Sequence, residues 1–257
     1  MSLIESITRG KGNKPPRLFV YGQEGVGKST FGAAAPSPVF VQTEDGLGEI
    51  DTAKFPVAGN YDDVKNALAA LRDEPHGFQT VVLDSADWLE RLIWDKVCQD
   101  FGVRSIEKAD GGYGKGYVHA LTYWRQIVSL LNDLRNTRGM IVIVIAHSKV
   151  ERFEDPENAA YDRYTPRLNK HAASLIAEWV DAVLFANKKF RVSKDSNDRA
   201  IAAPIGADGG ERIIRTVGSP ACIAKNRYGL PGEIPLSWTA FVKAYQKTLE
   251  ENHGKVQ

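Results

Sequence analysis

The chain has 257 residues, of which 43% are hydrophobic and 25% charged, which suits one large globular domain or two small ones and excludes a disordered, collagen-like or coiled-coil protein. Its 33 basic and 32 acidic residues give a net charge of +1, without the large positive excess of a constitutive nucleic-acid binder. Two distant cysteines, short apolar runs and no signal-peptide pattern predict a reducing, cytoplasmic setting without a disulfide framework or a membrane partner.

Strands and helices are predicted to alternate along most of the chain. The predicted strands are 17–21, 39–43, 80–83, 140–146 and 180–185, and the predicted helices are 28–35, one beginning near 62, one that includes 88–97, 118–135, one before 180 and 238–250. Continuous apolar strands between amphipathic helices predict an α/β fold, with a mainly parallel sheet covered by helices on both faces. Short β-prone runs between 187 and 225 predict antiparallel strands that extend this sheet.

Loops are expected at the glycine-rich residues 102–117 and at the polar residues 148–168. We predict a lead segment at 1–16, a core at 17–237, and a C-terminal helix and tail at 238–257.

The strongest motif is Gly22-Gln23-Glu24-Gly25-Val26-Gly27-Lys28-Ser29-Thr30, which fits the phosphate-binding pattern G-x-x-x-x-G-K-[ST] between a predicted strand and a predicted helix. Its backbone N–H groups would surround phosphate oxygens. Lys28 would reach the β- and γ-phosphates, and the Ser29 hydroxyl would ligate Mg²⁺. The motif therefore predicts ATP and Mg²⁺ as ligands.

A second metal ligand and a base are also predicted. Asp84 follows the strand 80–83 and would hold Mg²⁺ with Ser29, although an Asp there could instead cap a helix. Many ATPases place a glutamate directly after this aspartate, but Ser85 occupies that position here. If the strand 39–43 lies beside the strand 17–21, Glu44 projects toward the γ-phosphate as the base, with Asp45 in reserve.

The order of these motifs resembles the RecA-like P-loop ATPases, and Glu24 resembles the loop glutamate of that family. The family ends the following strand with a polar γ-phosphate sensor, usually glutamine. His147 matches the position but departs from the usual residue. The resemblance implies that His147 senses the γ-phosphate; the alternative is a histidine that only satisfies a strand end.

The run Ala224-Lys225-Asn226-Arg227-Tyr228-Gly229 resembles a late basic motif of the same family, whose cations reach a neighbouring subunit's nucleotide. The resemblance implies a homo-oligomer, ring or filament, with nucleotide at its interfaces and Lys225 and Arg227 acting in trans. The alternative is a pair of solvated charges. No other cation is an obvious candidate for neutralising the charge that develops on the γ-phosphate.

The compact core and the Lys-Asn-Arg-Tyr-Gly-Leu-Pro stretch are similar to phage-encoded RecA-like proteins linked to recombination and single-strand annealing. That resemblance implies single-stranded DNA and a single-strand DNA-binding protein as partners, in the bacterial host cytoplasm. Tyr113, Lys115 and Tyr117 could stack on bases and contact phosphates, unless their segment is a plain flexible loop. Residues 148–170 carry balanced charge, whereas 188–199 hold five cations and two acids and form another candidate surface.

The expected function is a slow, Mg²⁺-dependent ATPase of DNA recombination, repair or annealing, stimulated by DNA or by assembly. An ATP-driven nucleic-acid motor or packaging subunit is one alternative, and a small-molecule kinase is another. A scaffold that binds nucleotide without hydrolysing it would follow if Glu44 were inert.

Overall fold

The alternation of strands and helices is present in the computed structural model, which describes residues 3–7, 14–194, 200–206 and 210–253. The helices are α1 (Lys28–Ala33), α2 (Tyr61–Asp73), α3 (Ala86–Asp100), α4 (Lys115–Thr137), α5 (Lys170–Trp179) and α6 (Trp238–His253), with short 3₁₀ helices at Leu3–Ser6 and Ile106–Gly111. The strands are β1 (Arg17–Gly22), β2 (Pro38–Gln42), β3 (Ala53–Lys54), β4 (Thr80–Asp84), β5 (Ile141–Phe153), β6 (Tyr161–Pro166), β7 (Ala182–Lys188), β8 (Phe190–Lys194), β9 (Ala200–Pro204), β10 (Arg212–Arg215), β11 (Lys225–Asn226) and β12 (Glu233–Pro235).

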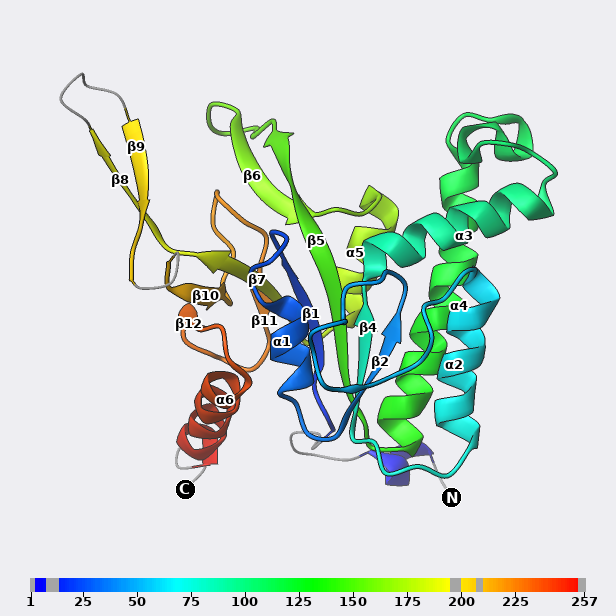
Figure 1. The fold of residues 1–257 in the computed structure, drawn as a ribbon, viewed down its shortest axis with the longest axis horizontal. Helices are drawn as coiled ribbons and strands as arrows, with labels where there is room; N and C mark the ends of the chain where they lie inside the picture. The colour runs from blue at the N-terminus through cyan, green and yellow to red at the C-terminus, as the bar shows by residue number, and fades with distance from the viewer. Residues whose placement is uncertain (1–2, 8–13, 195–199, 207–209, 254–257) are drawn as a thin grey trace.

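One sheet runs through the centre of the molecule, in the order β12-β10-β7-β1-β5-β4-β2-β3 (Figure 1). Strands β7, β1, β5, β4 and β2 are parallel, whereas β10 pairs antiparallel with β7 and β12 pairs antiparallel with β10. The predicted α/β fold class, with a mainly parallel sheet and antiparallel C-terminal strands, is confirmed.

Strand β2 does not lie beside the phosphate-loop strand β1, so the condition stated for the orientation of Glu44 is not met. Strand β2 pairs with β4 and β3, and β1 instead lies between β5 and β7. The carboxyl ends of parallel strands nevertheless share one edge of the sheet, so residues that follow β1, β2, β4 and β5 still converge there.

Two apolar cores follow from the alternation of side chains along the strands. Phe19 and Tyr21 face the core under α2, α3, α4 and α5. Leu18 and Val20 face the opposite core, under α1 and α6. The sheet is therefore fixed on both faces, which holds the strand ends at the shared edge in place.

The polar segment 148–168 is not the loop that was predicted. Strand β5 continues to Phe153 and pairs antiparallel with β6, from Ser148 opposite Pro166 to Phe153 opposite Tyr161. Val150 is 61% exposed in this hairpin. Because a solvated hairpin buries little apolar surface, its strands lack the hydrophobic alternation by which buried strands are recognised.

The glycine-rich segment 102–117 is also more ordered than predicted. It contains a 3₁₀ helix at Ile106–Gly111, and α4 begins at Lys115 instead of near 118. At Gly116 a side chain would collide with the carbonyl oxygen of Ile106. The glycine therefore serves close packing between these two helices.

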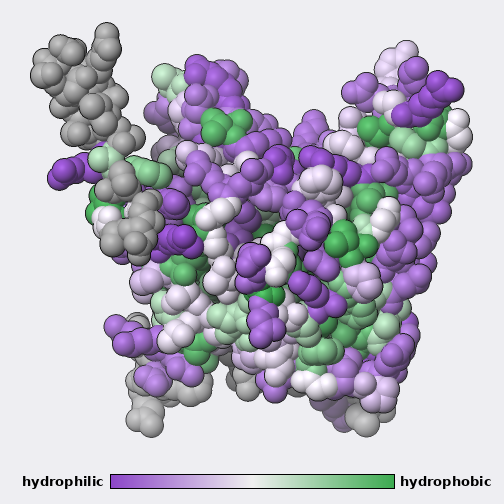
Figure 2. Space-filling view, in the orientation of Figure 1, coloured by the Kyte–Doolittle hydropathy of each residue, from purple (hydrophilic) through white to green (hydrophobic). Residues whose placement is uncertain are grey.

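Projections rise from the sheet on the side where β1 ends. The β5–β6 hairpin, the β8–β9 hairpin and the tip between α3 and α4 all extend upward in Figure 1. Hydrophilic side chains cover most of the β5–β6 hairpin and the α3–α4 tip (Figure 2).

Strands β8 and β9 form a separate two-stranded sheet instead of extending the main one. Residues 195–199 of the candidate surface 188–199 lie outside the described residues.

Candidate nucleotide-binding site

The phosphate-binding motif forms the turn between β1 and α1. Gly22 ends β1, and a side chain there would collide with the carbonyl oxygen of Ala186 on β7. Gly27 has a φ of 107° and directly precedes α1, a left-handed conformation that favours glycine. The first and last glycines of the motif are therefore required by strand packing and by the turn.

Lys28 is buried beneath this turn, with 6% of its surface exposed. Its Nζ donates hydrogen bonds to the carbonyl oxygens of Gly22 (3.1 Å) and Gln23 (2.8 Å). Burial lowers the pKa of Lys28, opposed by the charges of Asp84, Asp87, Glu44 and Glu24. The ammonium group is thus held inside the loop, in the place from which it would reach a phosphate.

Asp84 and Ser29 form the predicted pair of oxygen ligands. The Ser29 hydroxyl donates to the Asp84 carboxylate at 2.6 Å. Asp84 is the last residue of β4, and the residue that precedes α3 is Ser85, so Asp84 is not the cap of that helix. Burial, reinforced by Glu44, raises the pKa of Asp84. Because a buried charged carboxylate is costly, a cation beside Asp84 would be favourable. Mg²⁺ suits a hydroxyl and a carboxylate, since it takes few protein oxygens and completes its coordination shell with phosphates and water.

Glu44 is held by the loop that follows β4. The Ser85 hydroxyl donates to Glu44 Oε1 at 2.7 Å. The Thr43 hydroxyl donates to the Ser85 carbonyl at 2.8 Å and accepts from the Ser85 N–H at 2.9 Å. This reciprocal pair joins the end of β2 to the end of β4 and orients the carboxylate, although β2 is not adjacent to β1.

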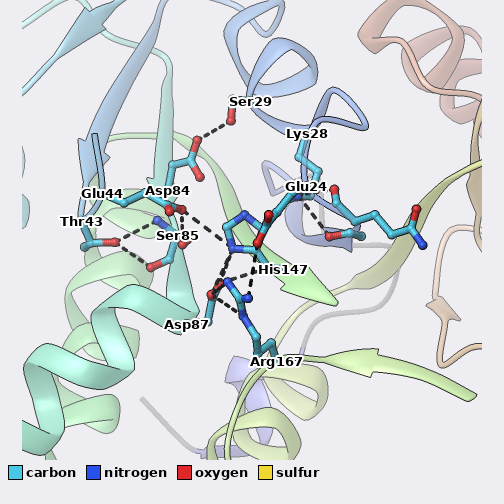
Figure 3. A network of polar contacts seen from close by, with 12 residues as sticks. Glu24, Lys28, Ser29, Thr43, Glu44, Asp84, Ser85, Asp87, His147 and Arg167 are labelled. Atoms are coloured by element: carbon cyan, nitrogen blue, oxygen red, sulfur yellow. Dashed lines mark hydrogen bonds and ion pairs between the residues drawn. The ribbon is translucent and has the colours of Figure 1, made fainter. Parts of the chain in front are cut away.

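His147 is part of a network that reaches the phosphate loop (Figure 3). Its Nδ1 lies 3.0 Å from Asp87 Oδ2, and its backbone N–H donates to the same carboxylate at 3.0 Å. Arg167 donates to Asp87 at 2.8 Å and lies 3.4 Å from Glu24 of the loop. Burial opposes the charge on Asp87, but the bonds from His147 and Arg167 outweigh it and hold its pKa well below the usual range.

These groups line one cavity of about 320 Å³ at the end of β1. Its walls include the predicted Gly25, Gly27, Lys28, Ser29, Thr30, Glu44, Asp84 and His147. The motif residues Gly22, Gln23, Glu24 and Val26 support the loop from outside the lining, and the reserve base Asp45 is not a wall residue either. The sequence thus brings together its predicted base, sensor, lysine and metal pair.

Two arginines at the site were missed by sequence reasoning. Arg167 lies in the segment predicted as a loop with balanced charge, so only the β5–β6 pairing reveals where it lies. Arg212, on β10, lines the cavity itself. The sequence did not make Arg212 an obvious candidate, because its position depends on the pairing of β10 with β7, which brings it to the edge where β1 ends.

Lys225 and Arg227 lie at the opposite end of the sheet. Lys225 pairs with the beginning of β7, and its Nζ donates to the carbonyls of Ala177, Glu178 and Val180 at the end of α5. Arg227 Nη1 lies 3.7 Å from Asp181, and its side chain is 53% exposed. Within one chain, neither cation joins the cavity.

The predicted DNA-contact residues differ in their surroundings. Tyr113 is fully exposed, and Lys115 is 55% exposed, 3.8 Å from Asp110. Tyr117 is half-buried and packs edge-on against Trp94, with ring centroids 5.4 Å apart. Tyr117 is therefore part of the packing between α3 and α4, unlike the fully exposed Tyr113.

The fold and the cavity define a P-loop nucleotide-binding protein. The AAA domain family matches residues 14–228, so the chain belongs to that family. In its sheet, β5 lies between the phosphate-loop strand and the Asp84 strand.

Known proteins similar to this chain include an SPbeta prophage-derived uncharacterized protein, YorG, of Bacillus subtilis (strain 168), which is 24% identical over 179 residues and 68% of this chain. The chain spans about half the length of that relative, 51%. Among solved structures, the crystal structure of the RadB recombinase aligns with 89% of this chain and 91% of its own, at 13% identity and a TM-score of 0.48.

Proposed function

We propose that this protein binds MgATP in the cavity at the end of β1 and hydrolyses it. The observation that carries the proposal is the convergence of Lys28, Ser29, Asp84, Glu44 and His147 on one cavity of about 320 Å³. Four different strands supply or precede these residues. A surface lysine in an ordinary glycine turn would not collect the remaining groups of a hydrolytic site around it.

Each residue has a role that follows from its chemistry. Lys28 would exchange its bonds to the loop carbonyls for bonds to the β- and γ-phosphates. Ser29 and Asp84 would hold Mg²⁺, which neutralises phosphate charge when bound. Glu44, oriented by Ser85, would accept a proton from the attacking water. His147, fixed by Asp87 through Nδ1, would present Nε2 to the γ-phosphate.

Two substitutions separate binding from hydrolysis. Lys28→Ala should abolish MgATP binding, measured by calorimetry, because a neutral methyl group replaces the phosphate contact. Glu44→Gln should still bind MgATP while phosphate release falls by about 10²-fold or more, because the amide keeps the acceptor for Ser85 but cannot take a proton.

Asp45→Asn is the matched control for Glu44→Gln, since Asp45 is exposed and adjacent but does not line the cavity. It should hydrolyse ATP like the wild type. MgATP binding that survives in Lys28→Ala would refute the site, and wild-type turnover in Glu44→Gln would remove the base from Glu44.

For the biological role we propose DNA recombination or single-strand annealing in a phage context, in the cytoplasm of a bacterial host. The prophage origin of the similar Bacillus subtilis protein supports the setting, and the fully exposed Tyr113 supports stacking on single-stranded DNA. Phosphate release measured with and without single-stranded DNA tests the role, and DNA should raise the rate.

A further inference from the structure

Arg212 lies beside the phosphate loop. Its strand, β10, and the Asp84 strand, β4, lie on opposite sides of β1 in the strand order. Arg212 begins β10 and pairs with Lys188 at the end of β7, the neighbour of β1. Its Nη1 would lie only 3.2 Å from a Cβ atom built on Gly27. The missing side chain of Gly27 therefore leaves room for a guanidinium group directly beside the loop backbone.

The Arg212 side chain has no acceptor in the part of the chain that the structure describes. No hydrogen bond or ion pair of its guanidinium is found there, and the residue is exposed. The nearby cation Lys189, by contrast, is paired with Glu211 (3.5 Å) and Glu233 (2.5 Å), and Arg167 is paired with Asp87 and Glu24. A fixed fork of donors beside a phosphate loop, without a carboxylate of its own, suits a phosphate ligand.

Arg212 also marks the junction of two hollows. It lines the main cavity and a second one of about 150 Å³, which share Gly27 and Thr30. The remaining walls of the second cavity come from residues in and around α1 and around the start of α6, and they include Phe31, Leu236, Ser237 and Thr239. Its walls combine apolar and aromatic side chains with a few hydroxyl groups, a composition typical of ligand pockets in general.

We propose that Arg212 binds the α- and β-phosphates of the nucleotide in cis, at the point where the nucleotide passes from the main cavity into the second one. The proposal rests on the proposed MgATP site and adds a phosphate-binding residue to it. Loop backbone N–H groups cradle the α- and β-phosphates in such sites, and Gly27 is the loop residue that Arg212 approaches. Arg212 would thus neutralise charge on the α-phosphate, which Lys28 is not expected to reach, and would share the β-phosphate with Lys28.

The test is calorimetric binding of MgATP and MgADP to the full chain. Arg212→Gln should weaken both by about 10–100-fold, the loss expected for one charge-assisted hydrogen-bonding partner. Arg212→Lys keeps the charge but not the fork and should fall between Arg212→Gln and the wild type. Arg125→Gln, an exposed arginine on α4, is the control for loss of one positive charge and should bind both nucleotides like the wild type.

The outcomes separate this inference from the proposed function. If Lys28→Ala abolishes nucleotide binding but Arg212→Gln binds within about twofold of the wild type, the role of Arg212 is overturned. The proposed nucleotide site itself is then kept. A loss confined to MgATP would overturn the placement at the α- and β-phosphates. A wild-type protein that binds neither nucleotide would overturn the site itself. Thermal unfolding without nucleotide should be unchanged in Arg212→Gln, because the side chain is exposed.

Discussion

His147 combines a structural bond at Nδ1 with a second ring nitrogen, Nε2, that makes no hydrogen bond within the described residues. Nδ1 faces the Asp87 carboxylate at 3.0 Å, which fixes the ring, and the residue also lines the cavity. A glutamine at the same position would present an amide donor to the cavity, as the resemblance to RecA-like ATPases implies. An alanine would present nothing.

The prediction for this residue is therefore a contrast between two variants. His147→Gln should keep phosphate release at saturating MgATP within about tenfold of the wild type, whereas His147→Ala should lose about 10²-fold, the usual cost of removing one oriented donor. MgATP affinity is measured separately to exclude a binding defect. An alanine variant as fast as the wild type would reduce His147 to a residue that satisfies the end of β5.

Glu90 is a buried carboxylate that the proposed chemistry does not use. It is 4% exposed, and both of its oxygens accept the Asn169 N–H, at 3.1 and 2.9 Å. Burial raises its pKa from 4.5 to about 7, opposed by Asn169 and by the charge of Lys149 and reinforced by Asp87. The folded state therefore holds a proton that the unfolded chain releases between these two pH values.

It follows that Glu90 contributes stability below about pH 4.5 and loses it as the pH rises through about 7. The shift corresponds to about 3 kcal/mol in the free energy of unfolding. Glu90→Gln keeps an acceptor without a charge, so its stability relative to the wild type should rise between pH 5 and pH 8 in urea unfolding. A difference between the two proteins that is the same at both pH values would contradict the shifted pKa.

At the scale of elements, the tip between α3 and α4 is the best-defined candidate for DNA contact. Tyr113 has a φ of 55° and a fully exposed ring, whereas Tyr117 is packed against Trp94. Tyr113→Ala should weaken single-stranded DNA binding by about 1–3 kcal/mol, the value of one lost base stack. Fluorescence anisotropy at fixed salt measures the loss.

Tyr117→Phe is the matched control, because it keeps the ring against Trp94 and should bind DNA like the wild type. Affinity should also fall as salt rises, since any phosphate contacts release counterions. Equal DNA affinity of Tyr113→Ala and the wild type would move the DNA contact away from this tip, to the cations of residues 188–194.

Buried elements were predictable from the sequence, whereas solvated ones were not. The central strands are continuous apolar runs, so β1, β2, β4, β5 and β7 were located, together with the carboxylates and the histidine that end them. The second half of β5 is exposed and polar, and its pairing with β6 has no hydrophobic period to reveal it. The position of Arg212 depends on which strand β10 pairs with. The spacing of residues along the chain does not predict which strands are neighbours in the sheet.

At the scale of the whole molecule, the positions of Lys225 and Arg227 decide which nucleotide they can serve. Arg227 lies beside Asp181, which accepts from Arg17 at the beginning of β1, whereas the phosphate loop follows the end of β1. A strand of six residues separates the two ends by roughly 20 Å. Arg227 therefore cannot reach the phosphates bound by its own chain, but a head-to-tail neighbour could receive it.

The two cations differ in how free they are to do so. Lys225 Nζ donates hydrogen bonds to three carbonyl oxygens at the end of α5, at 2.6, 3.1 and 2.8 Å. Lys225 therefore caps the C-terminal end of that helix. The Arg227 side chain is half-exposed, with one bond to the Glu178 carbonyl at 3.2 Å. Arg227 is thus the better candidate for a contact in trans, while Arg212 serves the chain that carries it.

Subunit mixing tests this division. If Arg227 acts in trans, Arg227→Ala and Lys28→Ala should each be nearly inactive, because a finger donated in trans is worth about 10³–10⁵ in rate. A mixture should regain activity, because an intact phosphate loop from the first variant can meet an intact Arg227 from the second. Phosphate release is measured across mixing ratios, with mixed assemblies verified by subunit exchange. Mixed assemblies without recovery would exclude Arg227 as a trans finger, because their interfaces would pair an intact phosphate loop with an intact Arg227 and still not restore turnover.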